Sequence, residues 1–252
     1  MKVQIAEPYQ HFEEELVNAI TNFGHTGKIL VKGSRNSIRK VKIQGQRLTI
    51  KSFQLPNFIN KFVYRFFRKS KAQRSFEYGQ KLIEEGFLTP KPVAWIEERK
   101  FFSLGRSYYI SKRLKNHFTF RELIKNPDFE NHEEIIRAFA GFTHRLHQAD
   151  ILFLDHSPGN TLIKKEKKGG WKFYLVDLNR MKFKKLSDRE KINNFSTLSA
   201  TPKMLDIMAT EYAKLEGWPI KETIEKFKVA DQNFRKRKSR KKKLKKLLWK
   251  KT

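Results

Sequence analysis

The sequence contains no cysteine among its 252 residues. This absence excludes disulfide bonds, thiol nucleophiles and cysteine-ligated zinc sites, and it suits a reducing compartment. Apolar residues still make up 38% of the sequence and aromatic residues 13%. A chain of this length and composition can bury a substantial hydrophobic core. We therefore expect a globular fold whose chemistry does not depend on sulfur.

Long apolar runs are also missing. No stretch reaches the roughly 20 residues that a membrane-spanning helix needs. The N-terminal stretch MKVQIAEPYQHFEEEL lacks the apolar segment of a secretory signal peptide. We therefore expect a cytoplasmic protein that is either soluble or peripheral to a membrane.

Acidic residues are scarce relative to basic ones. The chain has 55 Lys and Arg against 26 Asp and Glu, a formal net charge of +29. The segment Arg235–Lys251 holds 12 of the basic residues and no acid, which leaves 43 basic against 26 acidic residues elsewhere. Both the tail and the body are thus basic. Such a balance predicts a strongly anionic partner: nucleic acid, acidic lipid or a phosphorylated substrate.

The first half of the chain carries mainly strand signals. Residues 28–53 predict three short strands, because β-branched residues alternate around turns that contain glycine. Residues 55–86 favour helix with Gly86 as its stop. Prolines make residues 89–98 extended, and residues 106–114 predict another strand.

The second half is mostly helical. Asn131 followed by Glu134 is typical of a helix start. Apolar residues then recur every three or four positions, at Ile135, Phe139, Phe142 and Leu146. The stretch at residues 171–181 contains a predicted buried strand, which ends in Asp177. Residues 188–231 predict helix. This order predicts an α+β protein with two lobes rather than a regular βαβ alternation.

One set of polar residues suits phosphoryl transfer, which requires positioned cations, a metal held by carboxylate and amide oxygens, and a base beside the acceptor hydroxyl. In chain order the candidates are Lys51 on the third strand, Glu77 on the next helix, Asp155, Asn160 and Asp177. The spacing from Asp155 to Asn160 matches the catalytic-loop pattern D-x-x-x-x-N. Each residue alone has an ordinary explanation as a surface charge or a turn. Together, in this order, they favour a protein-kinase-like fold, with an antiparallel sheet and one main helix in the N-lobe and a mostly helical C-lobe.

Three stretches resemble one known family. They are RKSKAQRSFEYGQKLIEEGFLTPKPVAWIE, RLHQADILFLDHSPGNTLI and FYLVDLNRMKF. They are similar to the lipopolysaccharide core kinases, the Kdo/heptose kinase family of Gram-negative bacteria, over roughly residues 28–215. The resemblance implies a kinase that uses ATP and Mg²⁺ to phosphorylate a sugar hydroxyl of the lipid A–core precursor at the inner membrane. Kdo is the expected acceptor, and heptose is the alternative within the family.

The resemblance also implies a role for each candidate residue. Lys51 would hold the α- and β-phosphates, and Glu77 would orient Lys51. Asp155 would act as the base toward the acceptor hydroxyl, while Asn160 and Asp177 would bind Mg²⁺. Residues around the phosphate-covering loop and the adenine-flanking hinge would complete the nucleotide site: Gly33, Ser34, Asn36, Ser37 and Ser111.

The sequence departs from the protein-kinase pattern in several places. The phosphate-covering loop has one glycine, Gly33, instead of three. Phe153 and Leu154 replace the His and Arg that precede the catalytic aspartate in protein kinases, so control by activation-loop phosphorylation is not expected. Arg180 follows the DLN segment, where it would either contact an anionic substrate or form a structural ion pair.

Three histidines lie close to the expected catalytic loop. His144 and His147 are three residues apart, but without cysteine or an H-E-x-x-H motif a metal site is not expected there. We expect His147 to pack behind the loop. His156 adjoins Asp155, and we expect it to serve local structure, with a contact to substrate as the alternative.

The sequence predicts a division into 1–110 as N-lobe, 111–234 as C-lobe and 235–252 as a basic tail. Leucines at helical spacing among the lysines of the tail suit a helix on the anionic inner-membrane surface, and a disordered tail is the alternative. Nucleic acid binding is not expected, because no aromatic stacking platform is evident. Two other functions stay open: an atypical, RIO-like protein kinase, and a kinase-shaped binding module without catalysis.

Overall fold

The computed structural model describes residues 1–33, 36–53, 69–99 and 104–249, and the chain divides into two compact units. Unit 1 comprises Met1–Asn116 together with Tyr174–Arg180, and unit 2 comprises His117–Phe173 together with Met181–Thr252. The boundary therefore falls six residues later than the predicted end of the N-lobe at 110. The short segment that carries Asp177 belongs to unit 1, although most of the chain around it belongs to unit 2.

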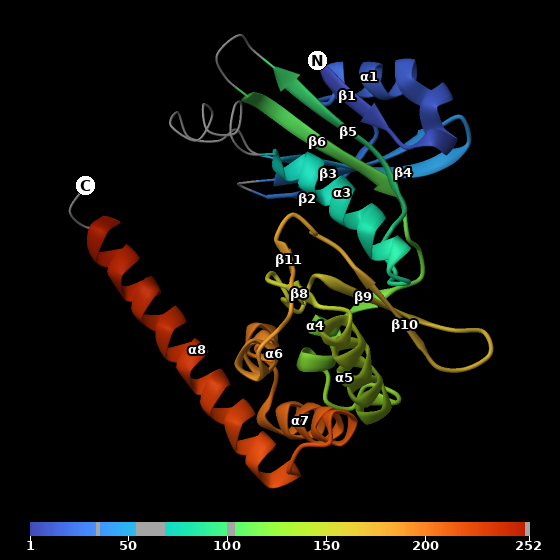
Figure 1. Ribbon diagram of the computed structural model, residues 1–252. Helices are drawn as coiled ribbons and strands as arrows, with labels where there is room; N and C mark the ends of the chain where they lie inside the picture. Colours follow the sequence, from blue (N-terminus) through green and yellow to red (C-terminus); the bar gives the residue numbers. More distant parts are fainter. Residues whose placement is uncertain (34–35, 54–68, 100–103, 250–252) are drawn as a thin grey trace. The chain divides into compact units, whose positions relative to one another are not determined.

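Unit 1 is built on a six-stranded antiparallel sheet (Figure 1). In sheet order its strands are β1 (Lys2–Ile5), β5 (Pro92–Arg99), β6 (Leu104–Lys112), β4 (Gln46–Phe53), β3 (Asn36–Ile43) and β2 (Lys28–Lys32). In the part of unit 1 that the structure describes, the helices are η1 (Glu7–Phe12), α1 (Glu13–Thr21) and α3 (Lys71–Glu84). The three strands predicted within residues 28–53 are confirmed as β2, β3 and β4, and the two later strands as β5 and β6.

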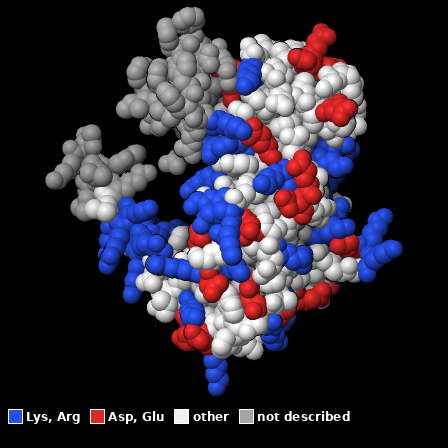
Figure 2. Space-filling model, viewed as in Figure 1, with Lys and Arg blue, Asp and Glu red and all other residues white. Residues whose placement is uncertain are grey.

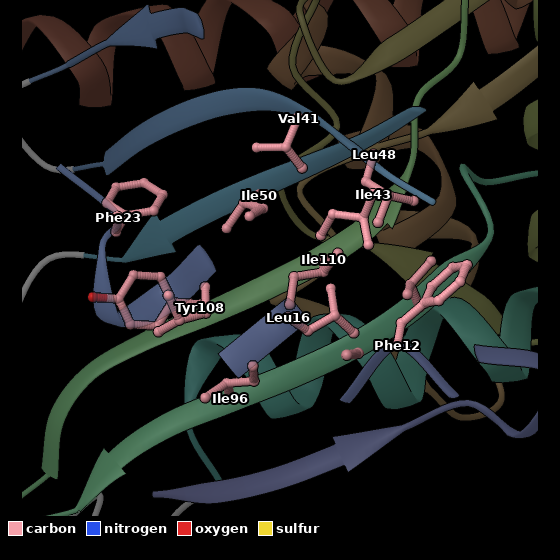
Figure 3. Close-up of a cluster of buried hydrophobic side chains, with 13 residues drawn as sticks. Phe12, Leu16, Phe23, Val41, Ile43, Leu48, Ile50, Ile96, Tyr108 and Ile110 are labelled. Carbon is pink, nitrogen blue, oxygen red and sulfur yellow. The ribbon is translucent and has the colours of Figure 1, made fainter. Parts of the chain in front are cut away.

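The core of unit 1 lies where η1 and α1 cover the sheet. Figure 3 shows apolar side chains from these helices meeting those of the central strands. The cluster contains Phe12, Leu16, Ile20, Phe23, Val41, Ile43, Leu48, Ile50, Val93, Ala94, Ile96, Tyr108 and Ile110. Because side chains alternate along a strand, the neighbours of Ile50 point to the opposite face of β4. A second cluster lies on that opposite face of the sheet, where Phe53 and Trp95 pack against Ala72 and Phe76 of α3.

Helix α3 begins and ends as the sequence indicates. The Ser70 hydroxyl accepts a hydrogen bond from the Gln73 backbone N–H at 3.1 Å and caps the first turn. After the last turn, Gly86 adopts a φ of 80°, a left-handed conformation that favours glycine. The helix predicted for residues 55–86 is thus confirmed from Lys71 onward, while residues 54–68 lie outside the described part of the chain.

Unit 2 is mostly helical with two small sheets (Figure 1). Its strands are β7 (Phe118–Thr119), β9 (Thr161–Lys165) and β10 (Trp171–Leu175) in one sheet, and β8 (Ile151–Phe153) with β11 (Met181–Phe183) in the other. Its helices are α4 (Phe120–Lys125), α5 (His132–Gln148), α6 (Asp188–Phe195), η2 (Ser196–Leu198), α7 (Pro202–Glu216) and α8 (Ile220–Trp249). The last two residues of β10 belong to unit 1.

Helix α5 buries the predicted apolar face, since Ile135, Phe139, Phe142 and Leu146 are all buried. Its start differs from the prediction. Asn131 lies in the left-handed region with a φ of 58°, and its side chain bonds to Glu130 instead of capping a helical N–H. Asn131 therefore marks the helix start through its backbone conformation, which asparagine tolerates better than most residues.

The basic tail is helical as far as Trp249. Helix α8 runs without a break from Ile220 to Trp249, so the tail continues a helix that starts in the body of unit 2. Its first half is anchored by buried Thr223, Phe227 and Ala230. Among the described helices, none is both long enough and apolar enough to cross a membrane.

Candidate active site

Strand β4 presents Lys51 on the α3 side of the sheet, opposite to buried Ile50. The Lys51 side chain is only 13% exposed, and its Nζ lies 2.7 Å from Oδ1 of Asp177. Its ammonium also lies over the ring of Phe53, 5.1 Å from the centroid. The sequence placed both residues in one site, and the structure brings them into direct contact.

The segment before Asp177 is tied to unit 1 by hydrogen bonds. The Leu175 N–H donates to the Leu88 carbonyl at 3.0 Å, and the Thr89 hydroxyl donates to the Leu175 carbonyl at 2.8 Å. Leu175 and Leu178 are both buried and flank the carboxylate on either side along the chain. These contacts fix where the chain leaves β10, and so they fix Asp177 near Lys51.

Asp177 itself adopts a conformation that is unusual for a residue other than glycine, with a φ of 63°. Such backbone strain persists only where the surroundings hold it, and it clusters at functional sites. Asn179, which is 7% exposed, donates from Nδ2 to Oδ1 of Asp177 at 2.6 Å. The same carboxylate oxygen thus receives Lys51 and Asn179. Asn179 was not among the candidates that the sequence provided, although its position two residues after a candidate metal ligand was a signal.

Glu77 does not contact Lys51 in this structure. Its carboxylate accepts from Nζ of Lys69 at 2.8 Å and from Nε2 of Gln73 at 3.0 Å. The expected pairing of Glu77 with Lys51 is therefore not observed among the described residues. The physical reason is competition between partners. Lys51 is already paired with Asp177, and Glu77 is already bonded to Lys69 and Gln73, which are close to it in sequence.

The expected catalytic loop follows β8, whose three residues are all buried. Within the loop the Ser157 N–H donates to the Asp155 carbonyl at 2.6 Å, and the Asn160 N–H donates to the Ser157 carbonyl at 2.9 Å. The Asn160 side chain also donates from Nδ2 to the Asp155 carbonyl at 2.8 Å. These bonds set the separation of Asp155 and Asn160. They leave the amide oxygen of Asn160 as the acceptor that can coordinate a cation.

A buried polar and aromatic layer supports the loop from behind. His156 is fully buried among Phe139, Phe153 and Phe195, and neither of its ring nitrogens has a hydrogen-bond partner among the described residues. Burial lowers the pKa of His156 to about 3. The histidine is therefore neutral and structural, as expected from the sequence.

His147 links this layer to the strand before the loop. Its ring contacts the Tyr212 hydroxyl at 2.9 Å and Oδ1 of Asn194 at 3.2 Å. Asn194 in turn donates from Nδ2 to the Phe153 carbonyl at 2.8 Å. Burial lowers the pKa of His147 to about 4, so it too is neutral. The prediction that His147 packs behind the loop is confirmed.

The expected nucleotide-binding loop is described only in part, because Ser34 lies outside the described residues. The Gly33 N–H donates to the Asn36 carbonyl at 3.1 Å, which links the residue after β2 to the first residue of β3. Asn36 and Ser37 are the first residues of β3, and the side-chain oxygen of Asn36 is buried without a partner among the described residues. Ser111 is 8% exposed on β6, opposite Thr49 of β4.

The donor chemistry fits a hard divalent cation. Mg²⁺ prefers carboxylate and amide oxygens. Unit 1 has such a carboxylate at Asp177, and unit 2 has such an amide at Asn160. Asp177 lies in unit 1, while Asn160 and Asp155 lie in unit 2. Among the described residues no group of three or more His, Asp or Glu forms a metal cluster of its own. Each unit therefore carries part of the chemistry that phosphoryl transfer requires.

A comparison with protein families connects this constellation to a known group. The model of the lipopolysaccharide kinase (Kdo/WaaP) family matches residues 37–216, which include every charged candidate residue from Lys51 to Asp177. The chain belongs to this family. Membership makes it a lipopolysaccharide kinase, a phosphotransferase that uses ATP. A comparison with curated proteins gave no significant match.

Two solved structures resemble the lipopolysaccharide kinase described above. The structure of WaaP in complex with acyl carrier protein has a TM-score of 0.64 at 15% identity, over 96% of this chain and 99% of that one. The Rio2 kinase–ADP/Mg²⁺–phosphoaspartate complex from Chaetomium thermophilum has a TM-score of 0.47 at 16% identity, over 90% and 77% of the chains. The WaaP likeness confirms the predicted fold class, an α+β fold with a sheet-based N-terminal unit and a helical C-terminal unit.

Proposed function

We propose that this lipopolysaccharide kinase transfers the γ-phosphate of ATP to a hydroxyl of Kdo in the lipid A–core precursor. The observation that carries the proposal is the contact of Lys51 with Asp177 at 2.7 Å within a chain of this family. A largely shielded cation beside a conformationally strained carboxylate suits the phosphate groups and the metal ion of a bound nucleotide.

In this proposal some residues bind the nucleotide and its metal ion, and one residue activates the acceptor. Lys51 binds the nucleotide phosphates, and Asp177, held by Asn179, provides a carboxylate oxygen for Mg²⁺. Asn160 provides an amide oxygen that can also bind Mg²⁺. Mg²⁺, when bound, neutralises the charge that develops on the phosphate. Asp155 accepts the proton of the acceptor hydroxyl while the hydroxyl oxygen attacks the γ-phosphorus. ADP leaves with the bridging oxygen.

The charge of the body supports an anionic acceptor. Outside Arg235–Lys251 the chain still has 43 basic against 26 acidic residues. A lipid A–core precursor carries phosphates and sugar carboxylates, which a neutral or acidic enzyme would attract less or repel. Kdo itself bears a carboxylate, whereas heptose does not, so the charge balance favours Kdo.

We further propose that the end of α8 holds the kinase on the anionic inner-membrane surface. From Arg235 to Lys246 every described side chain of α8 is exposed, and the stretch contains no acid. Figure 2 shows blue side chains gathered along this end of the helix. Like charges at helical spacing repel one another, so anions from a surface would stabilise this helix. Each Lys or Arg near acidic lipid contributes about 1 kcal/mol to binding.

An acceptor panel tests the proposed function. The protein is incubated with γ-labelled ATP and Mg²⁺ together with Kdo–lipid A, a heptose-terminated core, or the proteins of a cell lysate. We expect label on Kdo–lipid A. Label on the heptose-terminated core alone would move the acceptor to heptose, and label on lysate proteins alone would favour a RIO-like protein kinase. A melting temperature that Mg-ATP leaves unchanged would favour a binding module.

A further inference from the structure

We propose that Arg121 binds an anionic group of the acceptor, a carboxylate or a phosphate, beside the hydroxyl that is phosphorylated. The inference rests on the proposed function of Asp155, since it adds a recognition group to the same loop. Arg121 played no part in the candidate set that the sequence provided, and only the packing of unit 2 brings it to the loop.

The backbone of Arg121 is fixed to the loop. Its N–H donates to the Pro158 carbonyl at 3.1 Å, so α4 starts against the turn between Asp155 and Asn160. The residue before it, Phe120, is fully buried, and a capping box between Thr119 and Glu122 closes the first turn of the helix. The position of Arg121 relative to the loop is therefore set by packing and by hydrogen bonds.

The side chain of Arg121 lies over Gly159. A Cβ atom on Gly159 would come within 2.9 Å of Nη2 and 3.6 Å of Cζ of Arg121. Gly159 is not among the residues with a positive φ, so its backbone conformation does not require glycine. What glycine supplies at this position is space, and the guanidinium occupies that space. The chain thus places a cation directly on the turn that joins Asp155 to Asn160.

This guanidinium is exposed and has no side-chain hydrogen bond or ion pair among the described residues. Two other arginines of unit 2 have partners: Arg137 contacts Glu133 and Glu211, and Arg235 contacts Asp231. An arginine fork binds a carboxylate or phosphate through two parallel hydrogen bonds. The Arg121 guanidinium lies on the loop that carries the proposed base, Asp155. It therefore suits an acceptor that has a carboxylate or a phosphate next to its reacting hydroxyl.

Replacement of Arg121 by Gln tests this role, and Arg145→Gln provides a matched control. The Arg145 guanidinium also lies near a glycine, with Nη1 4.0 Å from a Cβ built on Gly141, but that glycine is on α5. We expect Arg121→Gln to raise the KM for Kdo–lipid A roughly tenfold or more, with the KM for ATP unchanged and partial recovery in Arg121→Lys. Arg145→Gln should behave like the wild type. Gly159→Ala should raise the acceptor KM without changing any charge.

Two modified acceptors identify the anion. If the Kdo carboxylate binds Arg121, its methyl ester should be a poor acceptor for the wild type and equally poor for Arg121→Gln. If a lipid A phosphate binds, the dephosphorylated lipid should show that pattern instead. An acceptor KM that is the same in wild type and Arg121→Gln would overturn the inference, as would equal changes in the KM values of ATP and acceptor.

Direct binding separates this inference from the proposed function. Binding of free Kdo and of inorganic phosphate is measured by ligand-observed NMR for wild type, Arg121→Gln and Arg145→Gln. We expect one of these anions to bind more weakly to Arg121→Gln than to both other proteins. Equal binding of both anions by all three proteins refutes the role of Arg121, whether or not phosphate is transferred. Absence of transfer by a wild type that binds the anion through Arg121 refutes only the proposed reaction.

Discussion

Lys51 Nζ lies 2.7 Å from Asp177 Oδ1, although 126 positions separate the two residues in the chain. The contact joins β4 to the segment Tyr174–Arg180. This segment lies in the C-terminal half of the chain but belongs to unit 1. The contact therefore shows how the chain returns a carboxylate to the sheet that carries the cation. The same carboxylate oxygen accepts a hydrogen bond from Asn179 at 2.6 Å.

Replacement of Lys51 by Met should remove the phosphate-binding cation and leave Asp177 without its ion-pair partner. We expect phosphate transfer to fall by roughly 10²–10³, as when an electrostatic group is removed from other active sites. Steady-state transfer to Kdo–lipid A measures the loss. Lys42→Met, at an exposed position of β3 in the same sheet, is the control and should retain activity. Full activity in Lys51→Met would contradict the assignment.

Asn179→Ala should free the Asp177 carboxylate from one of its two observed contacts. We expect the Mg²⁺ concentration for half-maximal activity to rise and kcat to fall roughly tenfold, because a hydrogen bond to a charged group contributes about 1.5–3 kcal/mol. A Mg²⁺ titration of activity and of the melting temperature with ATP measures both effects. Recovery in Asn179→Gln is not expected, since the longer side chain cannot keep the same geometry. An unchanged Mg²⁺ dependence would show that Asn179 has no influence on the metal site.

Folding stability should decrease as the pH falls from 7 toward 5. Burial lowers the pKa of His147 to about 4 and of His156 to about 3 in the folded protein. An unfolded histidine has a pKa near 6.5, so between about pH 6.5 and these lower values the unfolded chain binds more protons. At pH 5 each histidine should reduce the free energy of unfolding by about 2 kcal/mol relative to pH 7. Urea unfolding at both pH values measures the difference.

His156→Phe separates the two contributions. The ring nitrogens of His156 have no partner among the described residues, and three phenylalanines surround the ring. A phenylalanine should therefore fit at pH 7 with little loss of stability and should remove about half of the pH dependence. A pH dependence equal to that of the wild type would show that His156 is protonated in the fold or exposed to solvent.

The end of α8 should control adsorption to anionic membranes. We expect substitution of four exposed cations by Gln to weaken binding to phosphatidylglycerol vesicles roughly tenfold or more, since each cation contributes about 1 kcal/mol. The substituted residues are Lys241, Lys242, Lys243 and Lys246. The matched control carries the same change at the end of β9 and in the turn that follows it, at Lys164, Lys165, Lys167 and Lys168. Vesicle sedimentation in 0.1 M and 0.5 M salt measures the binding, which should weaken at the higher salt concentration.

Equal vesicle binding by the two four-residue variants would contradict the role of α8. Tighter binding to duplex DNA or RNA than to the vesicles, measured in direct competition, would instead identify nucleic acid as the partner of this helix. The two outcomes are distinguishable, because only the second makes nucleic acid displace the protein from the vesicles.

Much of the fold was readable from the sequence because its signals are local. The alternation in residues 28–53 predicted β2, β3 and β4, and the three- and four-residue repeat after Asn131 predicted α5. The N-terminal elements β1, η1 and α1 were not assigned, since each is short and its burial depends on the sheet that it covers. The tail was ambiguous for a related reason. Its cations disfavour an isolated helix, yet it continues a helix anchored by buried Phe227.

The candidate site was predictable in its order of residues but not in all of its contacts. Lys51 and Asp177 could be placed together because the chain order of lysine, glutamate, D-x-x-x-x-N and aspartate is that of protein-kinase-like enzymes. The actual partner of Glu77 is Lys69, and only side-chain packing decides between two lysines. Arg121 was missed because its relation to Gly159 depends on how α4 starts against the loop.

The most direct test of Asp155 as the catalytic base compares Asp155→Asn with Asp150→Asn. Asp150 is a nearby exposed carboxylate outside the loop, so its replacement controls for the loss of one charge. Label from γ-labelled ATP is followed into Kdo–lipid A, and the mass of the product confirms one added phosphate. We expect transfer by the wild type and by Asp150→Asn, with a loss of at least about 10² in Asp155→Asn. Equal transfer by all three proteins would show that Asp155 is not the base of a lipopolysaccharide sugar kinase.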